Sequence, residues 1–126
     1  MPVIKRVLCP LLLRRVPEQF SWIDHRLVRD RHIAGRSAEA LALYLLLVTV
    51  ADSQGLSYYS DAAMGRLLPL DAAGLAGARQ ELIRARLIAY QKPLYQVLSL
   101  DPLAAAPRSG AAQSLGQILR QMERQA

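Results

Sequence analysis

Apolar residues recur through the middle of this chain at the spacing of helices and short strands. The clearest helix begins after Ser37, a good N-cap, and is expected to stop near Gln54-Gly55, where glycine would supply a left-handed C-terminal residue. Its apolar positions repeat at helical spacing at Leu41, Leu45 and Val48. Because apolar residues fill its other sides as well, the pattern predicts a buried central helix.

A short strand and two further helices are predicted next. Residues 56–59 alternate like a strand, and Ser60 or Asp61 then caps one helix while Asp71 caps another. The turn Leu68-Pro69-Leu70 would join these helices as a helix-turn-helix. The second helix has a core-facing stripe at Leu75, Ala78, Leu82 and Ile83, and an outward set at Ala73, Gly74, Gly77, Gln80 and Arg84.

A β-hairpin and a last helix complete the pattern. Strand-like runs at residues 87–90 and 94–100 flank the tight turn Gln91-Lys92-Pro93. Residues 101–113 are rich in Ala, Pro, Gly and Ser, which is typical of a linker. An amphipathic helix is marked by Leu115, Ile118, Leu119 and Met122. Because this helix cannot bury its stripe alone, we expect it to fold back or to pair with a second copy or a protein partner.

The segment before Ser37 has a different character. Its prolines exclude a long helix over residues 1–22, and Phe20 and Trp22 are expected to pin it to a core. A short helix is predicted from Ile23 to about Ile33. The chain thus divides into an N-terminal arm with a short helix (1–36), a domain (37–100), and a linker with an amphipathic helix (101–126). The predicted fold class is α+β, mainly α with a small antiparallel β-sheet.

Positive charge is concentrated in the arm. Residues 1–36 hold 8 Lys and Arg against 3 Asp and Glu, whereas residues 37–126 hold 8 against 7. Such a field concentrates DNA, RNA or anionic lipid without choosing among them. The candidates for phosphate contacts are Lys5, Arg6, Arg14, Arg15, Arg26, Arg29 and Arg36. On a helix, the last two would share a stripe with His25 and His32; the alternative is a solvated face balanced by Asp24 and Asp30.

Few residues are suited to catalysis or metal binding. Cys9 is the only cysteine, which excludes an intramolecular disulfide, and only His25 and His32 could join it as zinc ligands. We therefore expect no catalytic residue, metal site or cofactor, and an inert or core thiol at Cys9. The longest apolar run, residues 38–51, is shorter than the ~20 residues that span a bilayer. We expect a cytoplasmic protein that does not bind membranes.

Three segments carry a resemblance to a known family: LSYYSD at 56–61, AMGRLLPLD at 63–71 and ARQELIRARLIAY at 78–90. With the order helix, strand, helix, turn, helix, hairpin, residues 37–100 resemble the winged helix-turn-helix DNA-binding superfamily, in particular bacterial repressors and the N-terminal domains of plasmid replication initiators. The resemblance implies a recognition helix in the major groove and a wing on the DNA backbone. The implied contacts are Ala73, Gly77, Gln80 and Arg84 on the helix and Lys92 on the wing.

This implied surface is poor in side chains that read bases. Relatives often place a polar reader where Gly77 stands, and a glycine where Arg86 stands, so Arg86 would adopt a strained left-handed conformation. We therefore expect a non-enzymatic protein that binds double-stranded DNA mainly through phosphates, as a regulator or an accessory factor of replication or of a mobile element. The alternative is a winged-helix protein–protein interaction module, in which the Ala/Gly-rich helix face docks another protein.

Four tyrosines fall on the predicted strands: Tyr58, Tyr59, Tyr90 and Tyr95. Aromatic cross-strand pairs stabilise small sheets, so we expect these rings in the core. The alternative is stacking on unpaired bases, which normally needs surrounding cations, and only Lys92 is near.

Overall fold

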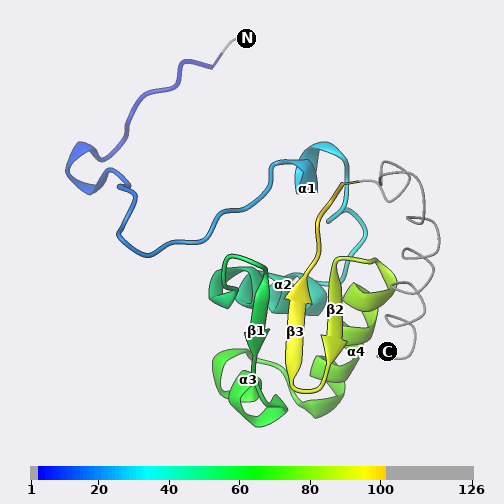
Figure 1. The fold of residues 1–126 in the computed structure, drawn as a ribbon. Helices are drawn as coiled ribbons and strands as arrows, with labels where there is room; N and C mark the ends of the chain where they lie inside the picture. The colour runs from blue at the N-terminus through cyan, green and yellow to red at the C-terminus, as the bar shows by residue number, and fades with distance from the viewer. Residues whose placement is uncertain (1–2, 102–126) are drawn as a thin grey trace, which may run out of the picture.

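The structure, a computed structural model, describes residues 3–101, which form an α+β fold (Figure 1). Its α-helices are α1 (Arg26–Arg29), α2 (Ala38–Val50), α3 (Asp61–Leu67) and α4 (Ala72–Arg84). Its strands are β1 (Leu56–Tyr58), β2 (Ile88–Gln91) and β3 (Leu94–Val97). The arm holds a 3-10 turn, Pro10–Leu12. The predicted linker and the amphipathic helix expected to pair lie outside the described residues.

Short polar side chains begin the three longer helices, as predicted. The Ser37 hydroxyl accepts a hydrogen bond from the Ala40 amide at 3.1 Å, and the Ser60 hydroxyl accepts one from the Ala63 amide at 3.1 Å. The Asp71 carboxylate accepts one from the Gly74 amide at 2.7 Å. These bonds satisfy amides that have no partner within the helix.

The strands form one antiparallel sheet in which β3 lies between β1 and β2. The predicted hairpin is present, because β2 and β3 flank the turn at Lys92-Pro93 and pair Tyr90 with Tyr95. Strand β3 ends at Val97, earlier than the apolar run to Leu100 indicated. The Tyr95 ring is fully buried, whereas Tyr58 at the sheet edge is 71% exposed, so the core prediction is confirmed for the first ring and wrong for the second.

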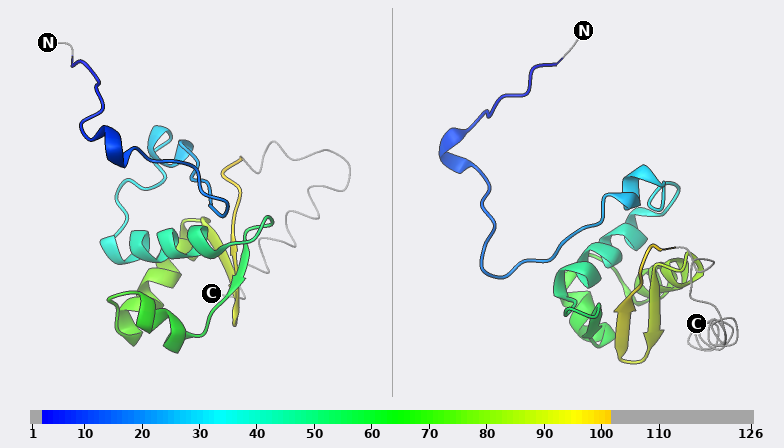
Figure 2. Two further views of the ribbon diagram at one scale, coloured as in Figure 1. Left: turned by 90° about the vertical axis from the view of Figure 1, so that its left-hand side faces the viewer. Right: turned by 45° about the horizontal axis from the view of Figure 1, so that its top comes forward.

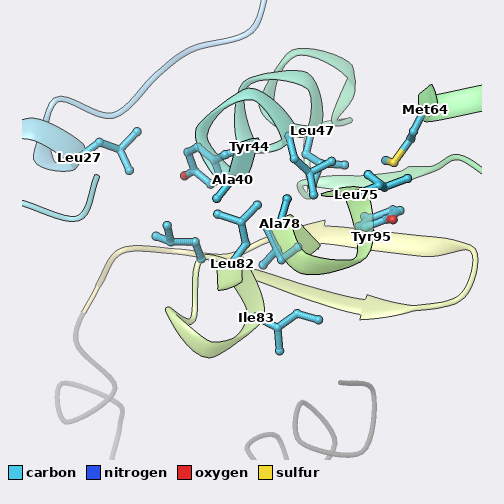
Figure 3. Close-up of a cluster of buried hydrophobic side chains, with 13 residues drawn as sticks. Leu27, Ala40, Tyr44, Leu47, Met64, Leu75, Ala78, Leu82, Ile83 and Tyr95 are labelled. Carbon is cyan, nitrogen blue, oxygen red and sulfur yellow. The ribbon is translucent and has the colours of Figure 1, made fainter. Parts of the chain in front are cut away.

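One hydrophobic core lies between the helices and the sheet (Figure 3). Helix α2 packs against α4 and β3, and α3 packs against α4. The predicted stripe of α4 is buried at all four positions: Leu75, Ala78, Leu82 and Ile83. The core therefore fixes which face of α4 is turned outward.

Helix α2 ends earlier than predicted. Its last residue is Val50, because the Asp52 carboxylate accepts hydrogen bonds from the amides of Gln54 and Leu56 and turns the chain into β1. Gly55 is left-handed, with φ +83°, but it lies in this turn and does not end the helix.

Helix α2 is also less enclosed than its all-round apolar pattern predicted. Its Leu45 is 57% exposed and lies in an apolar groove of about 630 Å³ between α1 and α2. The prediction of a helix buried on every side was therefore wrong.

The helix predicted from Ile23 to Ile33 is only one turn, α1. It ends because Arg31 is left-handed, with φ 61°, which carries the chain off the helical path. Ile33 instead packs against the core, and its amide bonds back to the Leu27 carbonyl at 3.2 Å. The predicted helical stripe of His25, Arg29, His32 and Arg36 was therefore wrong, because no single helix contains these residues.

The arm is attached differently from the way its aromatic residues suggested. Phe20 and Trp22 are 66% and 75% exposed, so they do not pin the arm to the core. The attachment is instead a hydrogen bond of 2.8 Å, donated by the Ser21 hydroxyl to the Thr49 carbonyl at the end of α2. Before Ser21 the chain leads away from the helices (Figure 1; Figure 2, right). Cys9, on this part of the arm, is exposed and is not a core thiol.

Candidate nucleic-acid interface

Helix α4 turns a face of small residues toward solvent. Ala73 and Gly77 are exposed, and a Cβ added at Gly77 would meet no atom within 4 Å. Gln80 is half-buried, and Arg84 is exposed in the last turn. The four predicted contact residues of α4 are thus not buried in the core. Only two of them, Gln80 and Arg84, have side chains that form hydrogen bonds.

A cation that the sequence analysis did not single out fixes the other side of α4. The Arg79 side chain is only 12% exposed, and its guanidinium lies 2.9 Å from the Asp61 carboxylate and donates to the Tyr95 hydroxyl at 3.0 Å. It also lies 4.6 Å from the centre of the Tyr90 ring, within range of a cation–π interaction. Arg79 therefore links α3, α4 and the hairpin.

Arg79 stays charged in this site. Burial lowers the pKa of Arg79, but its hydrogen bonds to Asp61 and Tyr95 outweigh burial and hold the pKa above its ordinary value. Burial raises the pKa of Tyr95, so this phenol keeps its proton while it accepts from Arg79. Local sequence carries no signal for this cluster, since Arg79 lies beside Gln80 and resembles any solvated helix residue.

The start of α2 is joined to the middle of α4 through Glu81. Ser37 donates two hydrogen bonds to this carboxylate, one from its hydroxyl at 2.7 Å and one from its amide at 2.8 Å. These bonds, which favour the ionised form, lower the pKa of Glu81. The N-cap of α2 therefore also holds α4 in its orientation.

Exposed cations lie around α4 and the hairpin. Lys92 at the hairpin turn and Arg84 on α4 are exposed, and both were predicted contacts. Arg66 and Arg86 are exposed as well, but the sequence analysis did not include them among the contacts. Within residues 3–101, none of these four forms an ion pair. Arg86 is left-handed, with φ 60°, which is the conformation expected for it from the sequence.

The cations of the arm fall into two groups. Lys5, Arg6, Arg14 and Arg15 are exposed and form no ion pair with any residue of the described range. They are therefore available for phosphate contacts.

Arg26 belongs to the second group, because it is already paired. Its guanidinium lies 2.7 Å from Asp24 and 2.6 Å from Asp101. The hydrogen bonds from Arg26 lower the pKa of Asp24 to about 2, and those to the two carboxylates raise the pKa of Arg26. Arg26 thus joins α1 to the segment after β3, and its charge is balanced within the fold.

The two remaining arm candidates lie apart. Arg29 is 67% exposed and is 3.5 Å from Asp30, whereas Arg36 is half-buried and donates to the His32 carbonyl at 3.2 Å. The exposed cations without an ion pair in residues 3–101 therefore include two sets. One set is on the arm before Ser21, and the other lies around α4 and the hairpin.

Two further observations concern the described part of the chain. Among residues 3–101, no three His, Cys, Asp or Glu residues are grouped so that they could hold a metal ion. No helix in that same range is both long and apolar enough to cross a membrane.

Comparison with known proteins gave no match. The chain matches no protein-family model, and no curated protein and no solved structure matches it significantly. Function must therefore be inferred from the fold, the exposed surfaces and the charges of the chain itself.

Proposed function

We propose that this chain is a non-enzymatic winged helix-turn-helix protein that binds double-stranded DNA mainly through phosphate contacts. The element order α2, β1, α3, α4, β2, β3, with β3 central in the sheet, supports the winged-helix assignment. In that arrangement α3 and α4 form the helix-turn-helix, α4 is the recognition helix and the β2–β3 hairpin is the wing.

The observation that carries the proposal is the set of unpaired exposed cations on the arm, Lys5, Arg6, Arg14 and Arg15. The arm is held at Ser21, and an extended chain from there to Lys5 spans up to ~55 Å at ~3.3–3.6 Å per residue. The arm can therefore follow the DNA backbone while the wing residue Lys92 contacts a phosphate elsewhere. Each neutralised phosphate releases condensed counterions, which drives binding without reading sequence.

The surface of α4 supports weak sequence specificity. Its exposed residues Ala73 and Gly77 carry no hydrogen-bonding side chain, so only Gln80 and Arg84 of the predicted contacts on this helix could distinguish base edges. A protein of this kind suits a role as a regulator or as an accessory factor of replication or of a mobile element. We place that role in the cytoplasm.

The test is binding of the purified full chain to a mixed-sequence duplex between ~50 and 200 mM salt. We expect log K to fall linearly with log salt. Lys92→Gln removes one positive charge from the exposed hairpin turn. It should weaken binding and make the salt slope shallower by about 1. Absence of binding at ~50 mM salt would overturn the proposal.

A second candidate, a winged-helix protein–protein interaction module, is favoured by the apolar side chains of the arm. Leu8, Leu11 and Leu12 are 82%, 99% and 80% exposed, and phosphate contacts would not cover them. A protein that shows no affinity for DNA at low salt and that loses self-association or partner binding on Leu11→Asp would fit this second candidate.

A further inference from the structure

The two exposed aromatic residues of the arm flank its point of attachment. Ser21 directs its hydroxyl toward the Thr49 carbonyl of α2, and Phe20 and Trp22 on either side are 66% and 75% exposed. The bond therefore anchors the backbone between two exposed rings.

Cations surround these rings in the chain. Arg14 and Arg15 precede Phe20 and are exposed, and Arg29, 67% exposed, follows Trp22. Two acids lie in the same segment: the Asp24 carboxylate is paired with Arg26 at 2.7 Å, and Glu18, between Arg15 and Phe20, is exposed. Aromatic rings beside a positive track are the arrangement that binds single-stranded nucleic acid.

A hollow adjoins the rings. It has a volume of about 660 Å³, and its lining includes Phe20, Trp22 and residues 97–101. Three aspartates also line it, of which Asp24 and Asp101 are paired with Arg26 and Asp52 accepts backbone hydrogen bonds. A hollow of this size would admit a base that has left its stack. The tyrosines of the sheet differ, since Tyr95 is buried and the Tyr90 ring is already in contact with the Arg79 guanidinium at 4.6 Å.

We infer that Phe20 and Trp22 stack on unpaired bases, so that the ligand is DNA with a single-stranded segment. The inference rests on the proposed function and narrows its ligand class. The arm cations hold the phosphates of the strand, the two rings hold its bases, and the winged-helix domain lies on adjoining duplex.

The test uses Trp22, the chain's single tryptophan, as a fluorescent reporter. The full chain is titrated at ~50 mM salt with an oligothymidylate and, separately, with a blunt duplex of equal length. We expect the single strand to quench Trp22 emission and the duplex to leave it unchanged. By anisotropy of labelled DNA, Phe20→Leu and Trp22→Leu should each weaken single-strand binding by about 5- to 150-fold, the effect of losing one stacked base, with duplex affinity unchanged.

Tyr58→Leu is the matched control, because Tyr58 is 71% exposed and lies on β1, away from the arm. It should change neither affinity. If Phe20→Leu and Trp22→Leu bind single strands as Tyr58→Leu does, or if oligothymidylate fails to quench Trp22, the inference is overturned while duplex binding stands. If neither DNA binds, the proposed function fails as well. A change in Trp22 emission with protein concentration alone would assign the rings to self-association and also overturn the inference.

Discussion

The guanidinium of Arg79 lies 2.9 Å from the carboxylate of Asp61, and this pair joins the middle of α4 to the first residue of α3. The same guanidinium reaches the Tyr95 hydroxyl and the Tyr90 ring of the hairpin. One cation thus links α3, α4 and the hairpin, in addition to the core contacts between these elements.

Replacement of Arg79 by alanine should lower the free energy of unfolding by about 2 kcal/mol, since a largely buried residue loses hydrogen bonds to a charged and a neutral partner. Asp61→Asn should cost less, about 1 kcal/mol or below, because the Asp61 side chain is 52% exposed and water screens the pair. Urea denaturation measures both changes. Equal losses for the two variants would show that the contacts of Arg79 with the hairpin contribute little.

Ser37→Ala should destabilise the protein more than Ser60→Ala. Each substitution removes an N-cap, worth about 1 kcal/mol. Ser37 additionally donates its hydroxyl hydrogen to Glu81, whereas Ser60 caps α3 alone. Thermal and urea unfolding of both variants gives the comparison, and in a Glu81→Gln background the difference between them should shrink. A difference that persists unchanged in that background would contradict a role for Glu81.

Acid should destabilise the fold through Asp24. Its pKa is about 2 in the folded chain against an ordinary value of 3.8, because Arg26 holds the ionised form by hydrogen bonds. The stabilisation is therefore fully present above pH 3.8 and is lost as the pH falls through 2. Urea midpoints measured from pH 5 to pH 2 should fall less steeply for Asp24→Asn than for the wild type. Parallel curves would show that this pair does not contribute.

Glycine substitutions should have opposite signs at two positions. Gly77→Ala should stabilise the protein by about 1 kcal/mol, because the added Cβ meets open space and alanine favours a helix. Gly55→Ala should destabilise it, because φ is +83° and the Cβ would lie 2.6 Å from the Val97 carbonyl oxygen. The melting temperature should rise for Gly77→Ala and fall for Gly55→Ala, relative to the wild type. Destabilisation by Gly77→Ala would mean that another part of the chain covers this face of α4.

Arg14→Gln with Arg15→Gln should weaken duplex binding and make the salt slope shallower by about 2, the contribution of two phosphate contacts. Gln80→Ala should leave the slope unchanged, because this uncharged residue releases no counterion. Anisotropy titrations across the salt series measure both. If Gln80→Ala weakened duplex binding more than the double variant did, the main contacts would lie on α4 and not on the arm.

Local signals predicted the elements of the domain well, since their causes are local. A capping side chain such as Ser37, Ser60 or Asp71 lies within three residues of the amide that it satisfies. The buried stripe of α4 likewise follows from helical spacing alone. The hairpin, by comparison, was indicated by two short strand-like runs and by the turn between them.

The parts that sequence could not supply depend on contacts between distant residues. The pairing of Arg79 with Asp61 spans 18 residues, and the bonds of Ser37 to Glu81 span 44, so no spacing rule reports them. The exposure of Phe20 and Trp22 was missed for a related reason. Aromatic residues next to a domain are usually anchors, and only the bond from Ser21 to Thr49 shows that the anchor is the serine between them.

That single bond at Ser21 also sets how the arm and the domain would act on a shared ligand. A flexible chain of the length from Lys5 to Ser21 has an r.m.s. reach of roughly 20–24 Å. Once the domain touches a strand, the arm therefore experiences that strand at an effective concentration in the millimolar range. Two contacts that are each weak alone would then act together in reversible binding. Loss of the Ser21 bond would only lengthen the free arm as far as Leu27, which is buried in the core.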